Sequence, residues 1–255
     1  LVKRLCAGPA DVDFVSDDGI AHTLWVVANA ADVAALQVAF AGVGALYVAD
    51  GHHRSAAASR VCALRRQQGR ESALAPWYWF LSVIFPHDQM KILPYNRVVL
   101  DLNGHGPEAL IAAIGERFDV ALTDAAAPNQ RHHFGMYLAG RWYTLTALEG
   151  TFPADDPVAS LDVAILQDNL LRPLLAIADP RTSDRIDFVG GIRGTSELEA
   201  RVDKTGGVAF AMYPTSIEEL MAIADAGAVM PPKSTWFEPK LRSGLVVRSI
   251  EEPPC

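Results

Sequence analysis

Residues 44–66, GALYVADGHHRSAAASRVCALRR, form the stretch around which the rest of the chain is organised. Ala45–Ala49 is a short apolar run of the kind that forms a buried strand, and it ends at Asp50-Gly51. His52–Leu64 is rich in alanine and predicts a helix. The sequence therefore predicts a strand, a turn and a helix in direct succession.

The predicted turn places two histidines and an arginine in the first turn of the helix. Free backbone N–H groups and the positive end of the helix dipole favour an anion there. His52, His53 and Arg54 add donors that suit a phosphate or a carboxylate. Asp50 is a carboxylate beside this site, so we expect it to bind a cation, take a proton or cap the helix. We interpret the stretch as an anion-binding turn with a carboxylate beside it.

A purely structural interpretation of the same residues stays open. Asp-Gly often forms a tight hairpin turn, and aspartate is a common helix N-cap. An exposed His-His-Arg sequence can also be an ordinary solvated helix start. These residues alone do not separate the two interpretations.

The composition describes an ordinary globular protein. The 255 residues can bury a core as one large domain or two small ones, and 50% of them are hydrophobic and 20% charged. The net charge of −8 argues against general binding to nucleic acid or to anionic membranes, although a local basic pocket is compatible with it. No apolar run of about 18 residues occurs, so no transmembrane helix is predicted.

The cysteines and the chain start bear on location. Cys6, Cys62 and Cys255 are scattered, without the spacing of a disulfide framework or a zinc site, which fits a cytoplasmic protein. The sequence opens at Leu1 without an initiator Met or a signal-peptide pattern. We expect a further N-terminal part in the native protein.

Strand-like and helix-like segments alternate along the chain. The expected strands are 22–28, 45–49, 77–85, 94–100, 119–122, 132–138, 141–145, 186–189 and 207–213, and the expected helices are 29–42, 52–64, 107–118, 160–178, 195 onward and 216–227. No internal repeat is detectable. The pattern predicts an α/β fold (α+β mixed), with a mixed sheet flanked by helices.

We expect three regions in this fold. Residues 1–98 carry the strand–turn–helix, 99–153 form a small inserted α+β unit with a hairpin, and 154–255 form a C-terminal α/β region that completes the site.

Two isolated features add candidate residues. Arg97 lies among apolar neighbours, where a charge needs a partner, so a structural salt bridge and a site role are both open. Gly190, Gly191 and Arg193 lie in a glycine-rich strand-to-helix turn that can cradle phosphate. The turn lacks Rossmann and P-loop spacing, so tight packing is the other explanation for its glycines.

The last informative stretch is residues 230–240, MPPKSTWFEPK. Its two prolines stiffen the backbone ahead of Lys233, whose ammonium suits a phosphate, as does that of Lys240. The hydroxyls of Ser234 and Thr235 can bind phosphate or a magnesium-bound oxygen. No glycine loop precedes them, so the stretch is not a P-loop, and an exposed turn is the structural alternative.

Five motifs in order resemble a bacterial and archaeal family known as domain of unknown function 1015 (DUF1015). They are ADGHHR, LPYNRVV, LDVAILQDNLLRPLL, IDFVGG and MPPKSTWFEPKLRSGLV, and the resemblance runs from about residue 25 to residue 247. Members of that family usually carry more chain ahead of this point.

The DGHHR turn also resembles the ParB/sulfiredoxin-like superfamily, in which the equivalent turn binds nucleotide phosphates and some relatives phosphorylate free serine. The resemblance implies a ParB/sulfiredoxin-like core, with Gly51, His52, His53 and Arg54 on phosphates and Asp50 near a metal or the reacting hydroxyl. ParB's DNA-binding helices are not recognisable here. We expect the superfamily's upstream acidic residue to lie in the further N-terminal part, so the general base is unassigned.

These observations lead to one main hypothesis and two alternatives. The main one is a phosphotransferase that uses ATP or ADP with Mg²⁺ to phosphorylate a small-molecule hydroxyl, with free L-serine as a candidate acceptor. Its catalytic residues are Asp50, His52 and His53, with Asp50 as the Mg²⁺ ligand. Its phosphate-binding residues are Gly51, His52, His53, Arg54, Lys233, Ser234, Thr235 and Lys240. The alternatives are a ParB-like nucleotide-binding switch without catalysis and a hydrolase of a phosphorylated metabolite.

Overall fold

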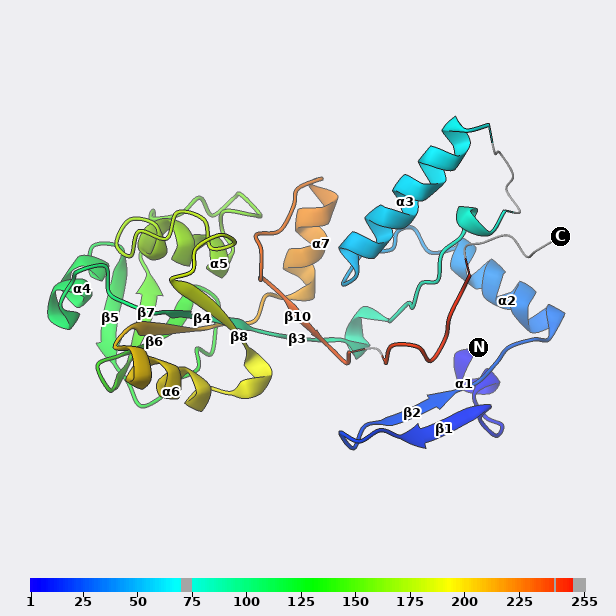
Figure 1. Ribbon diagram of the computed structural model, residues 1–255, viewed down its shortest axis with the longest axis horizontal. Coiled ribbons are helices and arrows are strands. Elements are labelled where there is room, and N and C mark those ends of the chain that lie inside the picture. The colour runs from blue at the N-terminus through cyan, green and yellow to red at the C-terminus, as the bar shows by residue number, and fades with distance from the viewer. Residues whose placement is uncertain (70–74, 241, 250–255) are drawn as a thin grey trace. The chain divides into compact units, whose positions relative to one another are not determined.

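A computed structural model describes residues 1–69, 75–240 and 242–249 of the chain (Figure 1). Leu241, from the last of the five motifs, and Cys255 lie outside the described residues. The chain divides into two compact units, Leu1–Val48 and Ala49–Cys255. Among the described residues, no helix is long and apolar enough to cross a bilayer.

The first unit contains a hairpin and two helices. Its elements are α1 (Val2–Leu5), β1 (Val12–Val15), β2 (Ala21–Leu24) and α2 (Ala30–Ala41), and β1 pairs antiparallel with β2. Helix α2 begins where it was predicted to, because the side chain of Asn29 accepts hydrogen bonds from the N–H groups of Ala31 and Asp32. The strand expected over 22–28 is shorter, since β2 ends at Leu24.

The second unit contains the remaining elements. They are α3 (His52–Gln67), the 3₁₀ turns η1 (Pro76–Tyr78) and η2 (His87–Gln89), β3 (Lys91–Leu93), β4 (Tyr95–Val99), α4 (Pro107–Ile114), β5 (Phe118–Leu122), β6 (His133–Leu138), β7 (Arg141–Ala147), α5 (Asp162–Leu166), the π-helical η3 (Gln167–Leu171), β8 (Ile186–Gly190), the 3₁₀ turn η4 (Gly191–Arg193), α6 (Ser196–Thr205), β9 (Val208–Met212), α7 (Ile217–Asp225) and β10 (Trp236–Glu238).

Six of these strands form one sheet in the order β5-β7-β6-β9-β4-β8, and β10 pairs with β3 separately. The combination of helices and strands confirms the expected fold class. Every pair between the described strands is antiparallel, however, where a mixed sheet was expected. The predicted hairpin β6–β7 shows one reason: Ala139 and Gly140 both have positive φ, which gives a two-residue turn between antiparallel neighbours.

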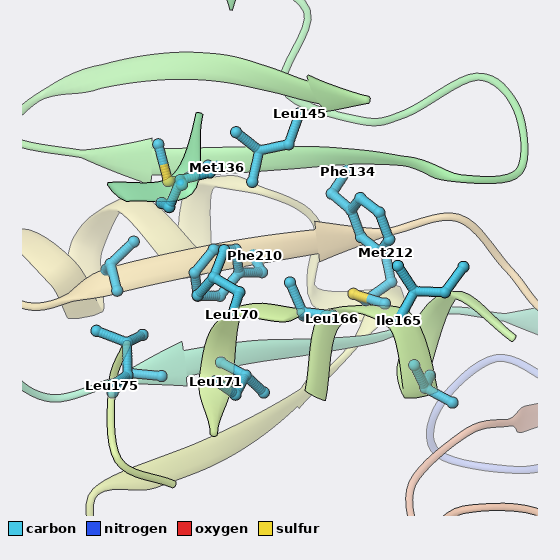
Figure 2. Close-up of a cluster of buried hydrophobic side chains, with 14 of the residues drawn as sticks. Phe134, Met136, Leu145, Ile165, Leu166, Leu170, Leu171, Leu175, Phe210 and Met212 are labelled. Atoms are coloured by element: carbon cyan, nitrogen blue, oxygen red, sulfur yellow. The ribbon is translucent and has the colours of Figure 1, made fainter. Parts of the chain in front are cut away.

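The sheet buries side chains on both faces. On one face, residues of β6, β7 and β9 pack against the apolar side of α5 and η3, as Figure 2 shows for Phe134, Phe210 and Leu170. The alternate residues point to the other face, where Tyr137 and Ala209 pack with Leu198 and Val202 of α6. This alternation along each strand places helices on both sides of the sheet.

Two predicted strands are wrong. Residues 45–49 and 79–85 form neither helix nor strand, and residues 76–78 form a 3₁₀ turn. Their aromatic and β-branched residues fit a pleated surface, but a strand also needs a partner for its backbone groups. Residue-type preference cannot supply that partner.

Asp162 is a buried carboxyl group at the start of α5. Its side chain is 8% exposed, and its Oδ1 accepts the N–H of His132 at 2.9 Å. His132 has φ +64 and precedes β6, so it is not the strand residue that was expected. Burial raises the pKa of Asp162 to about 7, with Glu219 adding to the effect, while the His132 N–H, Arg131 and Arg97 oppose it. The carboxyl group therefore titrates near neutral pH in the folded chain.

The free energy of unfolding should fall as the pH rises towards 7. The pKa of Asp162 is higher in the folded chain than its ordinary 3.8, so the folded state binds more protons between these two values. The contribution of Asp162 should be fully present below about pH 4 and fall by up to about 1.4 kcal/mol per pH unit until about pH 7. Urea unfolding of the wild type and of Asp162→Asn across this range measures the slope, which the substitution should flatten. Asp124→Asn, at an exposed position, is the control. Parallel slopes in all three proteins would refute the assignment.

Candidate functional site

The DGHHR turn begins helix α3. Gly51 is the residue before the helix and has φ +82, a left-handed conformation that glycine adopts without strain. Asp50 does not cap the helix, because its Oδ1 accepts the N–H of its neighbour Gly51 at 2.6 Å. His52, His53 and Arg54 are exposed in the first turn, beside N–H groups that lack intrahelical partners. The turn thus presents donors to solvent, as an anion site requires.

The carboxylate of Asp50 contacts the MPPKSTWFEPK segment. Lys240 Nζ lies 3.4 Å from Asp50 Oδ2, although 190 residues separate the two in sequence. Burial raises the pKa of Asp50, but the Gly51 N–H and the charges of Lys240 and Arg54 outweigh it, so the pKa lies below its ordinary value. The side chain of Asp50 is 63% exposed and that of Lys240 is 49% exposed, so the ion pair is weak and each residue can exchange its partner.

The MPPKSTWFEPK segment is held in the fold by strand β10, which pairs with β3. Phe237 is buried and pairs with Ile92 of β3, which leads directly into β4. Ser234 is buried, and its hydroxyl donates to the carbonyl of Pro231 at 2.6 Å, so this predicted phosphate ligand is engaged within its own loop. Lys233 is exposed, and Thr235 is half-buried. Of the predicted residues in this loop, Lys233 is the one that the fold presents most openly.

Arg97 explains the shape of this loop. Its side chain is 4% exposed, and its guanidinium donates to the carbonyl of Tyr95 and, at 3.1 Å, to the carbonyl of Lys233. It also lies over the ring of Phe188, 5.6 Å from the centroid. Burial lowers the pKa of Arg97 to about 10, and the charge of Asp162 opposes the shift. Among the described residues Arg97 therefore braces two backbone carbonyls, where a salt bridge or a ligand contact was expected.

A hollow of about 420 Å³ lies where β8, β10 and the start of β4 meet. It is lined by three aromatic residues, three cationic residues, one carboxylate and one glycine: Tyr95, Phe188, Trp236, Arg193, Arg201, Lys233, Asp187 and Gly190. The structure thus brings together three of the predicted candidates, Lys233, Arg193 and Gly190. A second hollow of about 310 Å³ shares Lys233 and Phe188 with it.

Packing accounts for the paired glycines of the predicted phosphate turn. A Cβ on Gly190 would lie 2.6 Å from a ring carbon of Trp236, and a Cβ on Gly191 would lie 2.7 Å from Cδ of Pro94. Gly191–Arg193 forms a 3₁₀ turn. The missing side chains therefore let the Trp236 ring lie on β8, which supports the packing explanation for both glycines.

Sequence reasoning missed the aromatic and acidic members of the hollow. Tyr95 and Phe188 belong to neighbouring strands, β4 and β8, and their rings meet edge-on at 6.5 Å. Asp187 forms an ion pair with Arg201, which lies 14 residues away on α6. Nothing local in the sequence joins these residues. Trp236 lies within the recognised MPPKSTWFEPK motif, so that motif was the one available signal.

The chain belongs to the family described as protein of unknown function (DUF1015), whose model matches residues 1–164. This confirms the resemblance to DUF1015 that the sequence motifs indicated. The comparison with curated proteins gave no match.

Several solved structures resemble parts of the chain. A mutant free serine kinase in complex with AMP is 15% identical with a TM-score of 0.37, and the match covers 61% of this chain and 58% of that one. A conserved hypothetical protein from Pyrococcus furiosus gives the same identity, TM-score and coverage of this chain, with 60% of its own chain covered. A mutant free serine kinase in complex with ADP is 15% identical with a TM-score of 0.36, with 61% and 58% covered. The chain thus spans under two thirds of these proteins.

Replacing Gly190 should disturb the hollow through Trp236. In Gly190→Ala the added Cβ overlaps the ring, so the ring or the strand must shift, and we expect the free energy of unfolding to fall by about 1–3 kcal/mol. Gly44→Ala is the control, because a Cβ there meets nothing within 4 Å. Urea unfolding of both variants provides the measurement. An equal, small change in the two would show that Trp236 does not rest on Gly190.

Proposed function

We propose that this DUF1015 protein is a nucleotide-dependent kinase that transfers a phosphoryl group to the hydroxyl of a small molecule. The observation that carries the proposal is the contact of Asp50 with Lys240, which joins the DGHHR turn to the MPPKSTWFEPK segment at 3.4 Å. Each segment alone offers an exposed charge. Together they supply a carboxylate beside several cationic and N–H donors.

This combination suits phosphoryl transfer. The reaction depends on positioning and on neutralising the charge of the phosphates. The N–H groups at the start of α3, the side chains of His52, His53 and Arg54, and the Lys240 ammonium offer donors to the phosphates, and Lys233 adds a second ammonium on the same C-terminal segment. Asp50 is ionised at neutral pH, and the neighbouring donors and charges lower its pKa further, so it can accept a hydrogen bond from an attacking hydroxyl.

In the proposed reaction the hydroxyl oxygen of the acceptor attacks the terminal phosphorus of ATP or ADP. The bond from that phosphorus to the bridging oxygen breaks, and the shortened nucleotide leaves. The acceptor's proton passes towards Asp50, while the cationic groups hold the phosphate oxygens. Free L-serine is the candidate acceptor. We further propose that the protein is cytoplasmic and binds neither nucleic acid nor membranes.

The residues present fit a magnesium ion held mainly by the nucleotide. Mg²⁺ commonly binds through one or two carboxylates together with substrate phosphates and water. The side chain of Asp50 is exposed and its Oδ2 forms a weak pair with Lys240, so it can provide one such ligand. The described residues contain no group of three or more acidic, histidine or cysteine side chains arranged to hold a metal ion. The nucleotide phosphates and water would therefore supply the other ligands. Bound there, Mg²⁺ would neutralise phosphate charge.

Asp50→Asn tests the proposal. The amide keeps the shape of the side chain but cannot take a proton or hold a metal as a carboxylate does, so transfer should fall by about 10²-fold or more. Nucleotide affinity should change by less than about tenfold, because the phosphate donors remain. Phosphate transfer from ATP or ADP to free amino acids and nucleotide calorimetry measure the two effects.

Asp124→Asn is the matched control, since Asp124 is exposed in a loop outside both motifs. It should match the wild type in both assays. Near-normal transfer in Asp50→Asn would overturn the assigned role. Nucleotide binding by the wild type without transfer to any acceptor would favour the switch, and phosphate release without an acceptor would favour the hydrolase.

A further inference from the structure

The hollow between β8, β10 and the start of β4 has an uneven charge balance. Arg201 pairs with Asp187 and with Glu197 at 2.7 Å, and Arg193 lies 3.5 Å from Glu197. Lys233 makes no ion pair with any described residue, and its Nζ lies 5.3 Å from the centroid of the Tyr95 ring. Lys233 is therefore the lining cation that is left to meet an anionic ligand.

The backbone that carries this ammonium is held by hydrogen bonds. Lys233 has φ +56, an uncommon conformation for a residue with a side chain. The buried Arg97 guanidinium holds its carbonyl at 3.1 Å. The carbonyl of the next residue, Ser234, accepts a hydrogen bond from the Thr215 hydroxyl at 3.2 Å. These two hydrogen bonds hold the backbone of Lys233 in its uncommon conformation, at the point where the residue lines the hollow. Residues held in such conformations are common at binding sites.

The remaining walls suit a flat ring. Tyr95, Phe188 and Trp236 are each half-buried, and Tyr95 contacts the other two edge-on, at 6.5 Å and 5.3 Å between centroids. Partly exposed aromatic rings beside guanidinium groups offer stacking surfaces for a nucleobase. The volume of about 420 Å³ lies in the range of small-molecule pockets.

Trp236 links this hollow to the carboxylate of the DGHHR turn. Lys240 Nζ lies 5.2 Å from the centroid of the Trp236 ring, and the same ammonium pairs with Asp50. A ligand with a ring at Trp236 and an anionic tail would therefore have two cations near it, Lys233 over the Tyr95 ring and Lys240 over the Trp236 ring.

We infer that the hollow lined by Tyr95, Phe188, Trp236 and Lys233 receives the nucleoside part of a nucleoside phosphate, with Lys233 binding a phosphate. The inference rests on the proposed function for the choice of a nucleotide. It adds that the base stacks against this aromatic cluster, remote in sequence from the DGHHR turn.

Comparing ADP with pyrophosphate separates the ring from the phosphates. Calorimetry on the wild type should show ADP binding at least about tenfold more tightly than pyrophosphate, the contribution expected of one stacked base. In Trp236→Leu and Phe188→Leu this preference should fall to about twofold or less. Lys233→Met should weaken both ligands by about tenfold, whereas Lys204→Met, an exposed lysine on α6, should change neither. An unchanged ADP preference in both aromatic variants would overturn the inference.

Photolabelling of the wild-type chain with 8-azido-ADP covers the case in which an aromatic variant does not fold. Peptide mapping should place the label within residues 94–97, 183–193 or 231–240, which carry the lining residues Tyr95, Phe188, Lys233 and Trp236. Labelling confined to other segments would overturn the inference. Transfer activity with the label elsewhere would support the kinase proposal and contradict the nucleoside site. Labelling at the hollow without transfer to any acceptor would support the nucleoside site and contradict the kinase proposal. Failure of the wild type to bind ADP would contradict both.

Discussion

The hydrogen bond from the buried Arg97 guanidinium to the Lys233 carbonyl is the contact on which the candidate site depends. It ties the loop before β10 to β4 of the central sheet, across 136 residues of sequence. Removing water from a charged group is costly, and the lowered pKa of Arg97 reflects that cost. The two carbonyls and the Phe188 ring that surround the guanidinium offset part of it. The bond holds the backbone of the loop that carries Lys233 and leads into Trp236 of β10.

Much of the fold could be predicted because its signals are local. Asn29 caps the start of α2, and Ser216 with Glu219 caps the start of α7. Ala139-Gly140 forms the turn between β6 and β7. Each of these signals involves residues only a few positions apart. The failures have the opposite cause. Residues 45–49 and 79–85 have strand-like composition, but pairing depends on segments far away in the chain. Strand direction fails for the same reason, since it follows from the complete topology.

The candidate site divides in the same way. The sequence marks the DGHHR and MPPKSTWFEPK segments, because each gathers unusual charges over a few residues. It cannot show that Asp50 and Lys240 meet, because that contact follows from the tertiary fold. Nor can it show that Tyr95 and Phe188 face the same hollow, because that follows from the register of β4 with β8. Arg97 is instructive. Its apolar neighbours correctly indicate burial, but its partners are backbone carbonyls, which no sequence pattern reveals.

The central claim is that two segments distant in sequence bind one polyanion. A crystal structure of the ADP complex tests it most directly. Our account predicts phosphate oxygens within about 2.7–3.2 Å of N–H groups in the first turn of α3 and of the ammonium of Lys240 or Lys233. ADP bound away from both segments, with the Asp50–Lys240 pair undisturbed, would contradict it.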